Sequence, residues 1–203
     1  MKELLLECVI CLCVAAFLMV VHELAKSIIY MLIQRVKGNK RRYTHSIWAL
    51  QRYIDPVGLL LAVAGSVTFS KPFMFRIQEK KTNRILGFTG FLVLIVCFVS
   101  SVLALHFHVL GVSGLETLQG HGFVAKAAVL TIQYIAILSF GMIVANLFPV
   151  STFDMGLIIA GFSAQKYLNI IKMDAIIKTI FIITVIIGLI QYGGYRLLDV
   201  LVG

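Results

Sequence analysis

Hydrophobic residues occur along this chain in long blocks separated by short polar stretches. The longest blocks cover residues 4–34, 85–110, 127–148 and 175–193. Each is near or above the ~20 apolar residues that a helix needs to cross a hydrocarbon core of about 30 Å. The pattern therefore predicts helices that span a membrane.

Two shorter apolar segments do not fit a full crossing. Residues 57–70 lie between Pro56 and Pro72 and are too short for an ordinary span, which favours a segment that enters the membrane and returns. Residues 155–163 are shorter still. We expect an all-α polytopic membrane protein with five to six transmembrane or re-entrant helices in one domain, residues 1–203.

Composition and charge support this interpretation. Of the 203 residues, 60% are hydrophobic and 13% charged, whereas a soluble domain is about half apolar and about a quarter charged. The net charge of +9 arises largely from Lys and Arg in two loops, residues 35–53 and 71–84. Basic loops beside apolar spans mark the cytoplasmic side, so we expect contact with the lipid bilayer and no nucleic-acid partner.

The position of these loops bears on topology. If residues 57–70 crossed the membrane, the two basic loops would lie on opposite sides. If the segment re-enters, both loops lie in the cytoplasm, as the positive-inside rule requires. We therefore predict the re-entrant form.

Candidate chemistry lies in the first apolar block, where residues 22–26 read HELAK. Positions i and i+4 share one face of a helix, and metalloproteases use HExxH to direct two histidines at Zn²⁺ while the Glu activates water. Here the second histidine is replaced by Lys26. Charged residues inside a membrane are costly and usually functional, so His22, Glu23 and Lys26 together indicate a site.

A second motif strengthens this interpretation. Residues 146–156 read NLFPVSTFDMG, an apolar segment that ends at a proline with an acidic residue five positions later. With this motif and HELAK, the chain resembles the site-2 protease family of intramembrane zinc metalloproteases (peptidase M50), most closely the small bacterial branch without a PDZ domain. Further matching segments, in family order, are IDPVG at 54–58, KP at 71–72 and GFTG at 87–90.

The resemblance implies a three-helix core with a short extended edge segment near 71–78, a location in the bacterial cytoplasmic membrane with the site facing the cytoplasm, and a transmembrane protein or peptide as substrate or partner. The site residues that it implies are Glu23 as the catalytic residue, His22 and Asp154 as zinc ligands with Lys26 in the position of the third ligand, and Gly90, Asn146 and Pro149 as contacts to the substrate.

Several residues depart from the family pattern. A protonated lysine cannot ligate zinc, and His22 with Asp154 falls short of the three protein ligands of a catalytic zinc site. His45, in the first basic loop, or a neutral Lys26 are the remaining candidates for a third ligand. The other departures are Tyr53, Phe91, Leu94, Ser151, Thr152 and Met155.

Three functions remain open. In the first, Lys26 neutralises Glu23 or Asp154, zinc is absent, and the protein is a pseudoprotease that binds or regulates a transmembrane partner. In the second, it is an active zinc protease with an atypical third ligand. In the third, it is a small transporter or channel component. We favour the pseudoprotease and predict that His22, Lys26 and Asp154 meet within contact distance.

Overall fold

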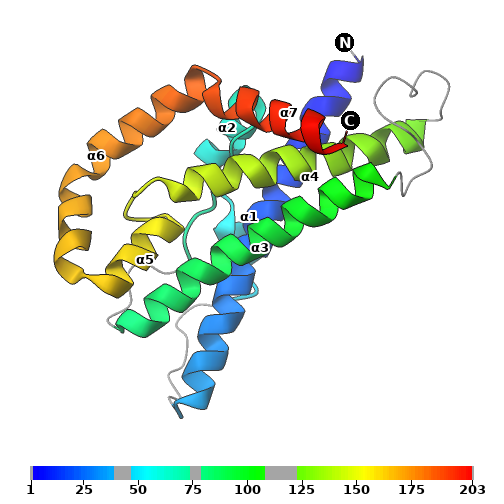
Figure 1. The fold of residues 1–203 in the computed structure, drawn as a ribbon. Coiled ribbons are helices and arrows are strands. Elements are labelled where there is room, and N and C mark those ends of the chain that lie inside the picture. The colour runs from blue at the N-terminus through cyan, green and yellow to red at the C-terminus, as the bar shows by residue number, and fades with distance from the viewer. Residues whose placement is uncertain (1, 39–46, 74–78, 108–122, 203) are drawn as a thin grey trace.

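The computed structural model describes residues 2–38, 47–73, 79–107 and 123–202, and within these ranges all regular secondary structure is helical. The predicted all-α class is confirmed for this part of the chain (Figure 1). The elements are α1 (Lys2–Val36), the short 3₁₀ helix η1 (Leu50–Tyr53), α2 (Pro56–Gly65), α3 (Lys80–His106), α4 (Phe123–Leu147), α5 (Asp154–Phe162), α6 (Ala164–Ile186) and α7 (Leu189–Val202).

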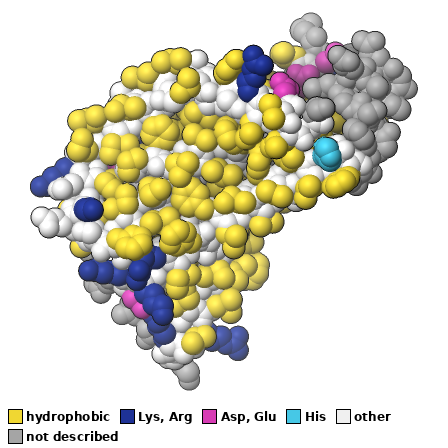
Figure 2. Space-filling model, viewed as in Figure 1, with side chains coloured by type: hydrophobic (Ala, Val, Ile, Leu, Met, Phe, Trp, Pro, Cys, Tyr) yellow, Lys and Arg dark blue, Asp and Glu magenta, His cyan; other side chains and the backbone are white. Residues whose placement is uncertain are grey.

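Three of these helices, α1, α3 and α4, are long and apolar enough to cross a membrane. The pair α6 and α7 passes the same test only together, with a bend of 54° between them. Hydrophobic side chains cover the centre of one face, while Lys and Arg gather at its lower end and left edge (Figure 2). The chain is an integral membrane protein, and its described residues include three candidate spans, or four if the bent pair is one span.

The bundle is centred on α3, which packs against α1, α4 and α5, while α1 also packs against α4 (Figure 1). Where the three helices meet, Leu18, Leu94 and Leu138 are almost completely buried. Cys11 belongs to this apolar core and Cys97 packs against it.

The short apolar segment folds as helix α2 followed by a non-helical stretch that returns beside it. Pro56 begins α2, and the side chain of Asp55 accepts hydrogen bonds from the first backbone N–H groups of the helix. The helix ends at Ser66, which has a left-handed φ of 53°. The chain then returns, and the backbone N–H of Lys71 donates to the carbonyl of Tyr53 at 2.9 Å. The two ends of the segment thus lie together, an arrangement that a re-entrant segment requires, while its re-entry into the membrane stays a prediction.

The boundaries of α3 and α6 differ from those expected. Helix α3 begins at Lys80, so part of the second basic loop is its first turn. Helix α6 begins at Ala164, eleven residues before the apolar block, because the Ser163 side chain caps it. Hydropathy detects only the apolar part of a helix, whereas lysine and glutamine are also good helix formers.

The last apolar block is not one continuous span. Gly188 has a φ of +75°, and its N–H donates to the carbonyl of Val185 as α6 ends. A left-handed glycine at the end of a helix is a common termination. Helix α7, which the sequence pattern did not predict, then packs against α4 and α3.

Candidate functional site: a buried charged cluster

Four ionisable side chains from α1 and α5, which lie far apart in the sequence, meet in the interior of the bundle. Helix α1 contributes His22, Glu23 and Lys26, and the first residue of α5 is Asp154. His22 Nε2 lies 2.7 Å from Asp154 Oδ2, and Lys26 Nζ lies 2.8 Å from Asp154 Oδ1. The predicted convergence of His22, Lys26 and Asp154 is confirmed.

The ammonium group of Lys26 bridges two carboxylates. Besides its contact with Asp154, Lys26 Nζ lies 2.5 Å from Glu23 Oε1. Glu23 and Lys26 are three residues apart on α1, a spacing that brings side chains together on one helix face. The sequence predicted that Lys26 neutralises one of the two acids, and in the structure it contacts both.

The contacts of His22 determine its protonation. Its Nε2 faces the Asp154 carboxylate, which can only accept a hydrogen bond when ionised. Its Nδ1 lies 2.9 Å from Ser70 Oγ and 3.2 Å from Glu23 Oε1. The Ser70 hydroxyl donates its own hydrogen to Glu23 at 2.8 Å, so it accepts from Nδ1. With Asp154 and Glu23 ionised, both ring nitrogens face acceptors, an arrangement that fits a doubly protonated imidazole.

With His22 doubly protonated, the cluster is neutral as a whole. His22 and Lys26 supply two positive charges, and Glu23 and Asp154 supply two negative charges. The four side chains are at most about 5% exposed, and buried charges are tolerated when they are paired and hydrogen-bonded. This balance would be lost if any one of the four were replaced by a neutral residue.

Glu23 also holds the chain that returns from α2. Its Oε2 accepts a hydrogen bond of 2.8 Å from the backbone N–H of Phe73, while Oε1 accepts from Ser70. Sequence reasoning did not assign Ser70 or Phe73 to the site. The residues of the predicted edge segment that follow, 74–78, lie outside the described ranges, and the described residues 71–73 form no helix.

Asn146 positions Asp154. The side-chain amide of Asn146 donates to the carbonyl of Met142 at 2.9 Å, within α4, and its Oδ1 accepts from the backbone N–H of Asp154 at 3.2 Å. The chain turns between these residues at Pro149, which removes a backbone donor and cannot continue a helix. The contacts of Asn146 are thus internal to the site, and its predicted contact with substrate stays a prediction, as does that of Pro149.

Helix α3 encloses the cluster through its backbone. A Cβ atom on Gly90 would overlap the Asp154 carboxylate and would lie 2.7 Å from His22 Nε2. One turn earlier, a Cβ on Gly87 would lie 2.8 Å from the Asp154 carbonyl oxygen. Glycine at both positions lets the helix pass directly over the charged groups. Gly90 therefore belongs to the site by contact, and its predicted role toward a substrate stays a prediction.

Tyr53 closes the side of the cluster next to η1. Its hydroxyl donates to the carbonyl of Ile47 at 2.5 Å and lies 3.3 Å from Ser27 Oγ. Ser27 in turn donates to the backbone carbonyl of Glu23 at 2.8 Å, and the ring of Tyr53 packs edge-on against Phe73 with centroids 6.4 Å apart. Tyr53, where the resemblance does not predict a tyrosine, thus belongs to a buried hydrogen-bond chain beside Glu23.

These residues do not fit a zinc ion. His22 Nε2 faces Asp154 Oδ2 and Lys26 Nζ faces Asp154 Oδ1, and His22 with Asp154 supplies only two of the three protein ligands of a catalytic zinc site. Among the described residues no group of three or more His, Cys, Asp or Glu side chains is arranged to hold a metal. His45 lies outside the described ranges, whereas His106 ends α3, sixteen residues or about 24 Å along the helix from Gly90.

A groove of about 390 Å³ lies beside the cluster, between the segment that returns from α2 and helix α6. Its apolar lining includes Phe69, Phe153 and Phe181, whose rings contact one another. Ser70, which contacts His22 and Glu23, also lines this groove. A molecule bound here would therefore be one side chain away from the charged cluster.

Comparison of the chain with protein-family models, with curated proteins and with solved structures finds no match.

Proposed function

We propose that this protein is a pseudoprotease of the site-2-protease type, which binds or regulates a transmembrane partner without cleaving it. The proposal places it in a bacterial cytoplasmic membrane with the cluster toward the cytoplasm. One observation carries the proposal: the Lys26 ammonium lies between Glu23 and Asp154, where a metalloprotease would need a metal ion.

The positive charge of Lys26 explains how Glu23 and Asp154 can both be buried without a metal ion. A buried carboxylate with no counter-ion is costly, and removal of one member of a buried ion pair destabilises proteins by about 3–5 kcal/mol. In a zinc protease the metal supplies the positive charge. Here Lys26 and a protonated His22 supply it, so the two carboxylates are stabilised in the interior without a zinc ion and without its hydrolytic chemistry.

The enclosure of the cluster argues in the same direction. A catalytic zinc keeps an open position for water or substrate, and the bound water is the nucleophile. The four side chains are at most about 5% exposed, and the backbone of α3 lies over them at Gly90. Hydrolysis at this place would require the helices to separate.

The groove beside Ser70 supports a binding role. Its walls are largely apolar, and Lys71 and Lys178 lie among its lining residues. Small-molecule and peptide sites combine apolar walls with a few polar groups in this way. We propose that the partner binds along the segment that returns from α2, which Glu23 holds in place through Phe73.

Zinc content tests the proposal. The full chain is purified in detergent with excess zinc, dialysed, and its metal content is measured for wild type, Lys26→His, Lys26→Gln and His22→Ala. We expect less than 0.1 zinc per chain in wild type and in Lys26→Gln, the matched control, since neither offers a third ligand. Lys26→His restores the i, i+4 histidine pair opposite Asp154 and should bind about one zinc per chain.

The opposite result is equally clear. About one zinc per chain in wild type, lost in His22→Ala, would show that another residue completes a metal site and that the protein is a zinc enzyme. Retention of zinc in Lys26→Gln would then exclude Lys26 as a ligand and direct attention to His45.

A further inference from the structure

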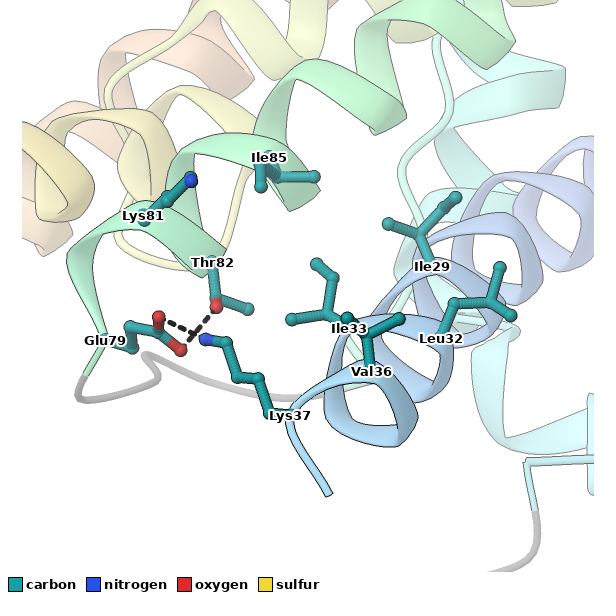
Figure 3. A pocket seen from close by; sticks show the side chains of 9 residues that line it. All are labelled: Ile29, Leu32, Ile33, Val36, Lys37, Glu79, Lys81, Thr82 and Ile85. Atoms are coloured by element: carbon teal, nitrogen blue, oxygen red, sulfur yellow. Dashed lines mark hydrogen bonds and ion pairs between the residues drawn. The ribbon is translucent and has the colours of Figure 1, made fainter. Parts of the chain in front are cut away.

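A second groove lies between the last turns of α1 and the first turns of α3 (Figure 3). Its volume is about 310 Å³. Ile29, Ile33 and Val36 project into it from α1, at positions that share one face of that helix. Ile85 faces them from α3. The walls of the groove are thus made of hydrocarbon from two helices that are long enough to span a membrane.

The polar groups of the groove are gathered at one edge. Lys37, just after α1, and Glu79, just before α3, form an ion pair there (Figure 3). The Thr82 hydroxyl donates to the other oxygen of Glu79 at 2.7 Å. Hydrogen bonds from Lys37 and Thr82 lower the pKa of the Glu79 carboxyl, which is therefore ionised at neutral pH. Lys81 adds a second ammonium group to this edge.

The edge as a whole is positively charged. The two lysines exceed the single carboxylate by one charge, and the exposed side chains of Arg35 and Lys80 lie in the adjoining helix turns. This edge is at the end of both candidate spans, where a transmembrane helix meets the polar headgroups of the bilayer. Basic residues in that position attract anionic lipids.

The chemistry of the groove limits what it can hold. An extended peptide would need hydrogen-bond partners for its backbone, and the Thr82 hydroxyl already donates to Glu79. A lipid acyl chain needs no such partners, and a phosphate group matches the lysines at the edge.

We propose that this groove binds an anionic phospholipid, with one acyl chain between α1 and α3 and its phosphate on Lys37 and Lys81. The phosphate competes with Glu79 for Lys37. This proposal depends on the groove and its charged edge alone, and it stands whether or not the cluster around Lys26 binds a metal.

Native mass spectrometry of the full chain tests the proposal. The protein in detergent is titrated with dioleoylphosphatidylglycerol or with dioleoylphosphatidylcholine, and the dissociation constant of the first bound lipid is measured. Wild type should bind phosphatidylglycerol more tightly. Lys37→Gln and Lys81→Gln should each weaken it about fivefold, with little effect on phosphatidylcholine. Glu79→Gln should strengthen phosphatidylglycerol binding because it releases Lys37.

Two further variants separate the groove from general surface charge. Lys166→Gln with Lys172→Gln removes two exposed lysines of α6, away from the groove, and should leave the preference unchanged. Ile33→Trp fills the groove and should weaken both lipids. A loss of phosphatidylglycerol affinity in Lys166→Gln with Lys172→Gln as large as in Lys37→Gln or Lys81→Gln, or equal affinity of wild type for both lipids, would overturn the proposal. So would unchanged lipid binding in Ile33→Trp, and a change only in its oligomeric state would assign the groove to a second copy of the chain.

Discussion

The α1–α3–α4 bundle has an apolar half and a charged half, separated by a single helical turn. Leu18 and His22 are four residues apart on α1, and Leu94 and Gly90 are four residues apart on α3. Both halves are equally buried. The apolar half is held by dispersion contacts, which are individually weak and have no preferred direction. The charged half depends on pairs of specific atoms, so the two should respond differently to the same substitution.

The largest effect is expected for Lys26→Met in the charged half. Methionine is close to lysine in length and fills the space, but it leaves Glu23 and Asp154 with His22 as their only counter-ion. We expect a loss of about 3–5 kcal/mol in the free energy of unfolding, and a similar loss for Lys26→Ala. Titration with sodium dodecyl sulfate from lipid–detergent micelles measures it. If Lys26→Met were as stable as wild type, the ion pairs of Lys26 with Glu23 and Asp154 would not stabilise the fold.

The second-largest effect is expected for Gly90→Ala, because it adds one methyl group where α3 passes over Asp154 and His22. Overpacking of this kind costs about 1–3 kcal/mol. Gly193→Ala in α7 is the matched control, since a Cβ there meets nothing within 4 Å and alanine is the better helix former. If both alanines were tolerated equally in the same titration, the close approach of α3 to the cluster would be wrong.

A smaller effect is expected in the apolar half for Leu94→Met. Leu94 is fully buried in the apolar core, but exchanges of similar hydrophobic volume usually cost less than about 1.5 kcal/mol. The comparison with Lys26→Met is direct, because both variants introduce methionine, one in the apolar half and the other in the charged half. Equal losses for the two methionine variants would mean that volume rather than charge holds the charged half together.

The smallest effect on stability is expected for Lys37→Gln. The Lys37–Glu79 pair is more than a third exposed on both sides, and exposed ion pairs contribute little to folding. Its unfolding transition should coincide with that of wild type. A large shift would show that the contact between the ends of α1 and α3 is structural rather than an edge available to lipid.

The sequence predicted the parts of this site that follow from helical spacing. HELAK places His22 and Lys26 on one face of a helix, and the order of the motifs brought Asp154 to them. Ser70 was adjacent to the KP match but had no motif of its own. Phe73 contributes a backbone N–H, which every residue except proline possesses, so no sequence pattern could identify it.

The fold was predicted in outline for a related reason. Long apolar blocks located α1, α3 and α4 to within five residues, because hydrocarbon thickness fixes their length. The start of α6 depends on the capping serine, Ser163, and the separation of α7 from α6 depends on the left-handed glycine, Gly188. Such local features decide where a helix ends and leave the average hydropathy almost unchanged.

A double-mutant cycle between Lys26 and Asp154 tests the central claim, that Lys26 serves as the counter-ion of a buried neutral cluster. Lys26→Met alone leaves the cluster with one excess negative charge, and Asp154→Asn alone leaves one excess positive charge. The double variant restores neutrality through His22 and Glu23. We predict that it is at least about 2 kcal/mol more stable than the sum of the single losses implies. Losses that add to within about 0.5 kcal/mol, as for independent sites, would contradict the claim.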